Sequence, residues 1–113
     1  MTPSELQRQV KAALETITAP VTKDYREYDG TYPHIVYSEI SNVPAFYGDN
    51  RELFFRAVYQ VAIVTDDDDY EVLESAVENV MLELGFIRSS AQDIFDGNFN
   101  RVLRFEISVL KSF

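Results

Sequence analysis

A long apolar segment in the middle of the chain constrains the fold more than any other feature. Residues 52–64 are rich in β-branched and aromatic side chains, and as a strand they would span about 40 Å at ~3.3 Å per residue. Ordinary strands have about five or six residues. Residues 57–64 are apolar on both faces except at Gln60, which is typical of a central strand covered on both sides. The segment therefore predicts a sheet built around this strand.

A helix is predicted at the N-terminus. Thr2 is placed to cap it, with Pro3 at the first helical position and Glu5 as the partner residue of a capping box. The helix is expected to end near Thr18, because the residue before Pro20 is biased out of the α region. Its apolar stripe consists of Leu6, Val10, Ala13, Leu14 and Ile17.

A second helix is predicted directly after the long strand, over residues 69–84. Gly85 stands where a helix C′ residue is expected. The apolar positions recur at helical spacing and form one stripe that faces the sheet. They are Leu73, Val77, Val80, Met81 and Leu84.

Two strand patterns lie between the first helix and the long strand. Residues 21–28 predict a short edge strand that ends at the turn signal Asp29-Gly30, and residues 34–40 predict a strand of more regular pattern. Residues 41–51, which include a proline and a glycine, are expected to form a loop before the long strand begins.

The last part of the chain predicts a hairpin. Residues 86–95 and 101–111 have strand patterns, and an Asp-Gly-Asn turn lies between them at residues 96–98. The predicted order is α-β-β-β-α-β-β. Because short turns join most of the strands, we expect a mostly antiparallel sheet with two helices packed on it, an α+β fold in a single domain over residues 1–113.

Composition restricts the classes of function. The chain has no cysteine, which excludes disulfides and thiolate metal sites. Its net charge of −9 would repel phosphate backbones, so we expect no sequence-independent binding of nucleic acid. There is no apolar run of the ~20 residues that a membrane span needs, and no secretory signal pattern, so we expect a protein that is made in the cytoplasm and has no contact with membranes.

Four consecutive aspartates, Asp66, Asp67, Asp68 and Asp69, follow the long strand. Carboxylates suit hard cations, but adjacent side chains in a turn cannot all point at one ion. We therefore favour helix capping, with one aspartate as N-cap and the others near the positive end of the helix dipole. His34 is the sole histidine and begins a strand, so we interpret it as structural. We accordingly expect no catalytic residue, no bound metal and no cofactor.

Aromatic side chains offer a better candidate for function. The loop residues Phe46 and Tyr47, and the turn residues Phe95 and Phe99, either fold back onto the sheet or form a docking surface, since aromatic residues are enriched at interfaces. A long strand also leaves unpaired backbone groups at a sheet edge, which proteins cover or use for pairing. We therefore add Phe54 and Arg56 of the long strand to the interface candidates.

The order of elements resembles the tail-completion, or tail-terminator, proteins of long-tailed bacteriophages and prophages, also called tail-to-head joining proteins. The similarity lies in the N-terminal helix at residues 4–17, the strand entered through Tyr-Pro at 32–37 and the apolar run at 59–64. It continues through the acidic start of a helix at 72–84 and the final strand at 101–109. It covers nearly the whole chain.

The resemblance implies a structural virion protein that is not an enzyme. Such a protein forms a homo-oligomer, a hexameric ring at the head-proximal end of the tail tube. The ring stops polymerisation of the tail tube protein and meets the head connector or stopper protein, while DNA passes through its lumen without specific binding. The implied location is the phage tail, with assembly in the host cytoplasm. We further hypothesise that acidic residues line the lumen.

Three alternatives stay open at the level of sequence. Another head–tail connector or a minor tail protein would have similar properties. A small metal-binding enzyme would use the four aspartates as ligands. A small ligand-binding α+β module is the third, although no residue pattern names its ligand.

Overall fold

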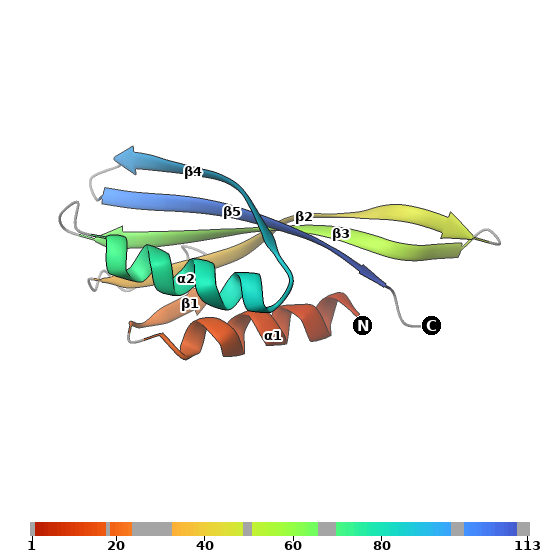
Figure 1. Ribbon diagram of the computed structural model, residues 1–113, viewed down its shortest axis with the longest axis horizontal. Helices are drawn as coiled ribbons and strands as arrows, with labels where there is room; N and C mark the ends of the chain where they lie inside the picture. The colour runs from red at the N-terminus through yellow and green to blue at the C-terminus, as the bar shows by residue number, and fades with distance from the viewer. Residues whose placement is uncertain are drawn as a thin grey trace.

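The described part of the chain forms one five-stranded sheet with two helices (Figure 1). The structure is a computed structural model that describes residues 2–17, 19–23, 33–48, 51–65, 70–95 and 99–110, with the backbone alone at 44–48, 51–53, 94–95, 99 and 110. In chain order the elements are α1 (Pro3–Glu15), β1 (Val21–Lys23), β2 (His34–Gly48), β3 (Arg51–Thr65), α2 (Glu71–Glu83), β4 (Ile87–Phe95) and β5 (Phe99–Leu110). Neither helix is long and apolar enough to cross a bilayer.

The strands lie in the order β1-β2-β3-β5-β4, so β3 is central, as its sequence predicts. The pairs β2–β3, β3–β5 and β4–β5 are antiparallel, whereas β1 runs parallel to β2. The predicted α+β class with a mostly antiparallel sheet is confirmed. The expectation of antiparallel neighbours does not hold at β1, because β1 and β2 start at the same end of the sheet and run in the same direction.

Both helices pack on the same face of the sheet, which we call the helix-side face (Figure 1). The two predicted helical stripes lie in its core, and the alternating side chains of β3 and β5 meet them there. This core consists of Leu6, Val10, Leu14, Ile35, Tyr37, Phe55, Ala57, Tyr59, Val61, Ile63, Val77, Met81, Phe86, Leu103 and Phe105. Tyr59 and Phe86 stack edge to face, with ring centroids 5.6 Å apart.

We call the opposite side of the sheet the helix-free face, since neither described helix covers it. A smaller buried cluster of Val36, Ala62, Val64 and Val102 lies on this face at the end of β3 that leads to α2. Towards the other end of β3, Val58 and Gln60 are only half-buried. The expectation that residues 57–64 are covered on both faces therefore holds from Ala62 onward and fails before it.

The hairpin of β2 and β3 extends beyond the rest of the sheet (Figure 1). β1 covers β2 only from Ile35 to Tyr37, and β5 pairs with β3 no further than Phe54. The molecule measures 51 × 25 × 23 Å, and its radius of gyration of 14.9 Å exceeds the ~13 Å typical of a compact chain of this length. We call the part of this hairpin beyond Phe54 the arm.

The predicted loop over residues 41–51 is wrong, because β2 continues through it to Gly48. Proline is accepted in edge strands and at bulges, and near Pro44 the strand β2 is an edge strand with a bulge. Its outer edge is unpaired by described strands after Tyr37, and the register with β3 shifts between Pro44 and Phe46. Phe46 and Tyr47 therefore belong to a strand of the arm.

The helix termini differ from the prediction in two places. Thr2 caps α1 as expected, and its hydroxyl accepts from the Glu5 amide at 3.2 Å. The helix ends at Glu15 rather than near Thr18, because the Thr16 hydroxyl donates to the Ala13 carbonyl at 2.7 Å and competes with continuation of the helix.

The predicted aspartate N-cap of α2 is wrong. Tyr70 occupies the N-cap and makes no side-chain capping bond, while Glu71 and Glu74 supply the negative charge of the first turn. The four aspartates lie outside the described residues, as does the predicted turn at 96–98. Gly85 is confirmed as the C′ residue of α2, directly after the C-cap Leu84, with a φ of 102° that favours glycine.

Candidate assembly surfaces

Exposed apolar side chains from three strands lie on the helix-free face. Val43 pairs with Arg56 and Ile87 pairs with Glu106, so both alternate with the buried helix-side residues. Val43 is 43% exposed, Phe54 36% and Ile87 68%. Exposure of an apolar side chain to water is unfavourable, and its free energy is recovered when another surface covers the side chain. Several exposed apolar side chains on one face therefore mark an interaction site.

Charged side chains are interspersed with these apolar residues. Arg56 and Arg104 are exposed on β3 and β5, and the half-buried Glu106 lies between them in the register. Among the described residues, the ion pairs involve Arg88 and Arg101, so Arg56 and Arg104 contribute to none of them. The face therefore combines apolar contact area with guanidinium groups, which is the composition of a protein interface.

A shallow hollow of about 270 Å³ adjoins Ile87 on this face. It lies at the start of β4, beside β5 and Arg56 of β3, and both charged and apolar groups line it. The lining residues are Arg56, Gly85, Ile87, Glu106, Ile107 and Ser108.

The structure places the aromatic interface candidates in two separate groups. Phe46 pairs with Phe54 and Tyr47 pairs with Glu52, so three of them lie together on the arm or at its base. Phe95 pairs with Phe99 beside Thr65, at the other end of β3. Thr65 lies eleven positions after Phe54 along β3, which is about 36 Å at ~3.3 Å per residue. One docking surface cannot include both groups.

Only two of the sequence-predicted interface residues, Phe54 and Arg56, have described side chains. Both are exposed on the helix-free face. The side chains of Phe46, Tyr47, Phe95 and Phe99 lie outside the described part, so their role stays a prediction. Sequence reasoning missed Val43 and Ile87, because their exposure depends on the register of β2 and β4, which no local pattern reveals.

The candidate acidic site, formed by the four aspartates, lies outside the described residues. Elsewhere in the described ranges, no three His, Asp or Glu side chains converge as metal ligands would. His34 is buried on β2, and its Nε2 lies 3.1 Å from the Thr22 hydroxyl of β1. That bond joins the parallel strand to the sheet and suits the structural role expected of His34.

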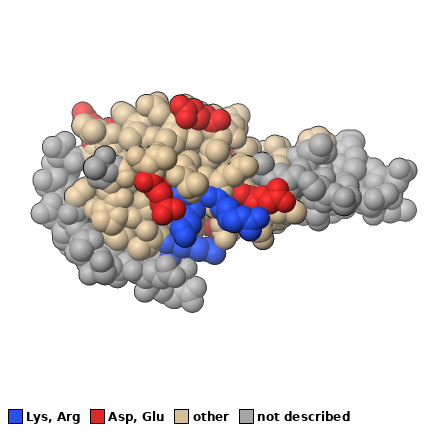
Figure 2. Space-filling model, turned by 90° about the horizontal axis from the view of Figure 1, so that it is seen from below, with Lys and Arg blue, Asp and Glu red and all other residues tan. Residues whose placement is uncertain are grey.

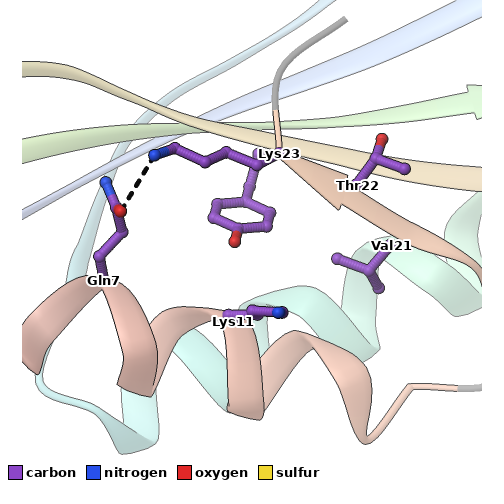
Figure 3. Close-up of a pocket in the computed structure, with 6 residues that line it drawn as sticks. Gln7, Lys11, Val21, Thr22 and Lys23 are labelled. Carbon is purple, nitrogen blue, oxygen red and sulfur yellow. Dashed lines mark hydrogen bonds between the residues drawn. The ribbon is translucent and has the colours of Figure 1, made fainter. Parts of the chain in front are cut away.

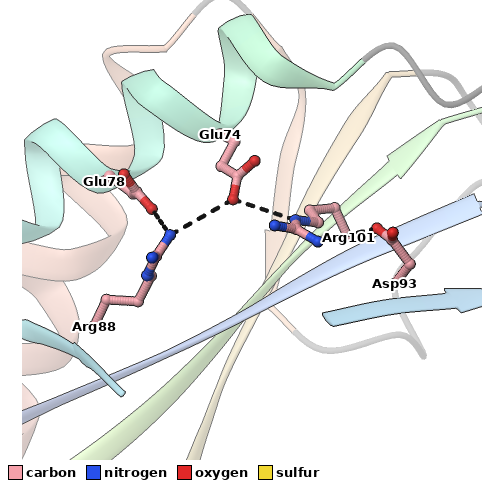
Figure 4. A network of polar contacts seen from close by, with 5 residues as sticks. All are labelled: Glu74, Glu78, Arg88, Asp93 and Arg101. Carbon is pink, nitrogen blue, oxygen red and sulfur yellow. Dashed lines mark hydrogen bonds and ion pairs between the residues drawn. The ribbon is translucent and has the colours of Figure 1, made fainter. Parts of the chain in front are cut away.

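An ion-pair network holds α2 against the edge of the sheet (Figure 4). Glu74 accepts from Arg101 Nε at 3.2 Å and lies 3.8 Å from the Arg88 guanidinium. Arg88 also binds Glu78, Asp93 accepts from Arg101 at 3.3 Å, and the Tyr70 ring lies 5.1 Å from the Arg101 guanidinium carbon. Partial burial is the largest single effect on Arg101 and acts to lower its pKa. The hydrogen bond and charge of Glu74, together with Tyr70 and Asp93, outweigh burial and raise the pKa of Arg101.

A buried tyrosine anchors the start of the open β2 edge. Tyr59 is fully buried and its hydroxyl donates to Glu39 of β2 at 3.2 Å. Burial, followed by the negative charge of Glu39, raises the pKa of Tyr59 above its ordinary value. The strands are therefore joined here by a polar contact as well as by the backbone, one residue before the bulge at Ile40.

No protein-family model and no curated protein matches the chain. Among solved structures, one match is the gp17 protein of bacteriophage SPP1, at 19% sequence identity, covering 90% of this chain and 88% of that chain with a TM-score of 0.46.

Proposed function

We propose that this protein is a structural assembly protein of a long-tailed bacteriophage, a tail terminator that forms a ring at the head-proximal end of the tail tube. The observation that carries the proposal is the helix-free face, where Val43, Phe54 and Ile87 are exposed on one side of the sheet. The resemblance in the order of elements supplies the phage context. The proposed action is mechanical, because the ring covers the end of the tube and offers a new surface to the head connector.

Interface size favours repeated contacts between subunits. A standard interface takes about 800 Å² from each partner, which is roughly an eighth of the 6670 Å² accessible surface of this chain. A subunit in a ring has two such interfaces, so about a quarter of its surface would be covered. The helix-free face has exposed side chains on β2, β3, β5 and β4 away from its buried cluster, which makes it a candidate for one of the two.

The arm suits a contact that is not self-complementary. It projects past β1 and β5, so it can reach a different surface on the next subunit, and a head-to-tail contact of this kind closes into a ring when the rotation permits. The outer edge of β2 also presents backbone groups beyond Tyr37 that no described strand pairs.

The test compares apolar residues on and off the proposed surface. We expect Val43→Ser with Ile87→Ser to reduce self-association at least tenfold in analytical ultracentrifugation, since each buried apolar contact is worth about 1 kcal/mol or more. The matched control is Val72→Ser with Leu82→Ser, because both residues are exposed on α2, at 81% and 54%. Equal loss in the two double variants would contradict the assignment of the surface.

A second test addresses the tail itself. Replacing Phe46 and Tyr47 of the arm with Ser should leave the thermal unfolding midpoint unchanged and abolish joining of heads to tails in an in vitro assembly assay. A lowered midpoint would instead show that these rings pack within the subunit. Tube length measured by electron microscopy separates a terminator from other connectors, because loss of a terminator gives overlong tubes.

The rival metal-binding enzyme is tested by calorimetric titration with Ca²⁺, Mg²⁺ and Mn²⁺. We expect no stoichiometric binding, since four adjacent carboxylates in sequence do not have the spacing of a hard-cation loop. Tight binding of one ion per chain that is lost when the four aspartates are replaced by Asn would favour the enzyme.

A further inference from the structure

A hollow of about 380 Å³ lies between α1 and β1, and two lysines line it (Figure 3). Lys23 of β1 extends towards α1, where its Nζ donates to the Gln7 side-chain oxygen at 3.0 Å. Lys11 follows Gln7 by one helical turn on the same side of α1, where Cβ atoms are about 5–6 Å apart. The remaining lining residues are Val21, Thr22 and Tyr37. The hollow therefore combines two ammonium groups with an apolar wall.

The positive charge of this region contrasts with the rest of the chain. α1 and β1 together contain three basic residues, Arg8, Lys11 and Lys23, and two acidic residues, Glu5 and Glu15. Their net charge is therefore +1, whereas the remaining residues sum to −10, which gives the chain its net charge of −9. Figure 2, which views the side where α1 lies in Figure 1, shows Lys and Arg side chains gathered near the middle of the face with acidic groups to either side.

The lysines of the hollow lack carboxylate partners among the described residues. The ion pairs among the described residues are made by Arg88 and Arg101, which do not line the hollow. Lys23 binds the neutral side-chain amide of Gln7. Two ammonium groups that line one hollow repel each other, and an anionic group placed between them would be attracted by both. The hollow thus fits a negatively charged occupant.

Protein carboxylates fit better than a nucleic-acid backbone. Duplex DNA carries one charge per ~1.7 Å and is bound by rows of cations. Here Glu5 and Glu15 lie on α1 before and after Lys11 in the sequence, and they would repel neighbouring phosphates. An acidic peptide needs only a local positive site, and the half-buried Val21 offers it apolar contact. The densest acidic run of this chain is its four consecutive aspartates.

We propose that the hollow lined by Lys11 and Lys23 binds the acidic segment at residues 66–69 of a second copy of this chain. The inference rests on the proposed function, in which each subunit meets its neighbour head to tail. It specifies one contact of the ring, in which the basic hollow on one subunit faces the aspartates of the next. Such pairing fixes the orientation of neighbouring subunits more than it adds affinity.

Zero-length crosslinking tests this contact directly. Carbodiimide joins a lysine amine to a carboxylate only when the two are in contact, and the chain has just three lysines, the third being Lys111. In an equal mixture of isotope-labelled and unlabelled full-length protein, we expect peptides that link Lys11 or Lys23 of one isotope to residues 66–69 of the other. Links confined to a single isotope would place the contact within one chain and overturn the proposal, as would the absence of any link at Lys11 or Lys23.

Charge reversal provides a quantitative test of the same contact. Lys11→Glu with Lys23→Glu should weaken self-association at least tenfold, and replacing the four aspartates with Asn should do the same, while Lys111→Glu should have no effect. A mixture of the two defective variants should regain association, since one variant keeps the hollow and the other keeps the acids. Failure of the mixture to associate would overturn the proposal.

Two further outcomes separate this inference from the proposed function. If the Val43 and Ile87 variants abolish association while the lysine variants retain it, the ring stands and the acidic contact is wrong. If a duplex oligonucleotide binds the wild-type protein in fluorescence anisotropy and Lys11→Glu with Lys23→Glu removes that binding, the hollow is a nucleic-acid site and the proposal fails.

Discussion

Replacing Glu74 with Gln should destabilise the protein more than the same change at Glu78, although both residues lie on α2 and contact Arg88. The Glu74 side chain is 15% exposed and its Arg101 partner 21%, so solvent screens this pair weakly. A hydrogen bond to a charged group contributes about 1.5–3 kcal/mol in such a position, and Gln keeps one acceptor oxygen. We therefore expect a loss of about 1–2 kcal/mol for Glu74→Gln.

The change at Glu78 should cost much less. Its partner Arg88 is 46% exposed, and exposed ion pairs contribute about 0–1 kcal/mol after screening. We expect Glu78→Gln to lower the free energy of unfolding by about 0.5 kcal/mol or less. The difference arises from burial, since the two carboxylates have the same chemistry and lie one helical turn apart.

Urea denaturation followed by circular dichroism measures both changes. With a slope of about 1–3 kcal/mol/M, the midpoint should fall by about 0.5–1 M for Glu74→Gln and by a small fraction of that for Glu78→Gln. A double-mutant cycle with Arg101→Gln isolates the coupling of Glu74 to Arg101, which should be about 1 kcal/mol. If Glu74→Gln were no more destabilising than Glu78→Gln, the network would not hold α2 on the sheet and the reasoning from burial would be refuted.

Three further predictions concern single residues. Thr2→Ala should lower the free energy of unfolding by about 1 kcal/mol, because the cap on the Glu5 amide is lost, whereas Thr2→Ser should retain it; urea midpoints check both. Gly85→Ala should cost about 1–2 kcal/mol through its φ of 102°, since a Cβ would meet Ile107 only at an ordinary 3.4 Å, and Gly85→Asn should cost less. The raised pKa of Tyr59 means that the unfolded chain releases this proton first, so stability should be fully present below pH 10 and should fall above it by about 1.4 kcal/mol per pH unit. Tyr59→Phe should lose that part of the slope, and an unchanged pH dependence in this variant would contradict the assignment.

Local signals predicted the elements whose determinants lie close together in sequence. The cap at Thr2 and the glycine after α2 each depend on a few neighbouring residues, and the structure confirms both. The apolar stripes of the helices and the central place of β3 follow from periodicity and composition, which report burial directly.

The errors occur where distant partners override local preference. Residues 41–48 contain loop-forming residues, yet they pair with β3, because the backbone of a long central strand must find hydrogen-bonding partners. The aspartates before α2 matched a capping pattern, but the helix begins after Tyr70. The same holds for the candidate surface. Phe54 could be predicted from the sequence as an aromatic residue in an apolar strand, whereas the exposure of Val43 and Ile87 depends on how β2 and β4 pair with their neighbours.

The sequence by itself determined the α+β class, the acidic and cysteine-free character and the two helical faces that form the core, because composition and periodicity are properties of single segments. Only the tertiary structure decided that both helices cover one face, that β1 runs parallel to β2 and that the arm projects beyond the sheet. It also brought Lys11 and Lys23 to one hollow from separate elements. The physical reason is that strand register and direction depend on contacts between residues far apart in sequence, which local patterns do not specify.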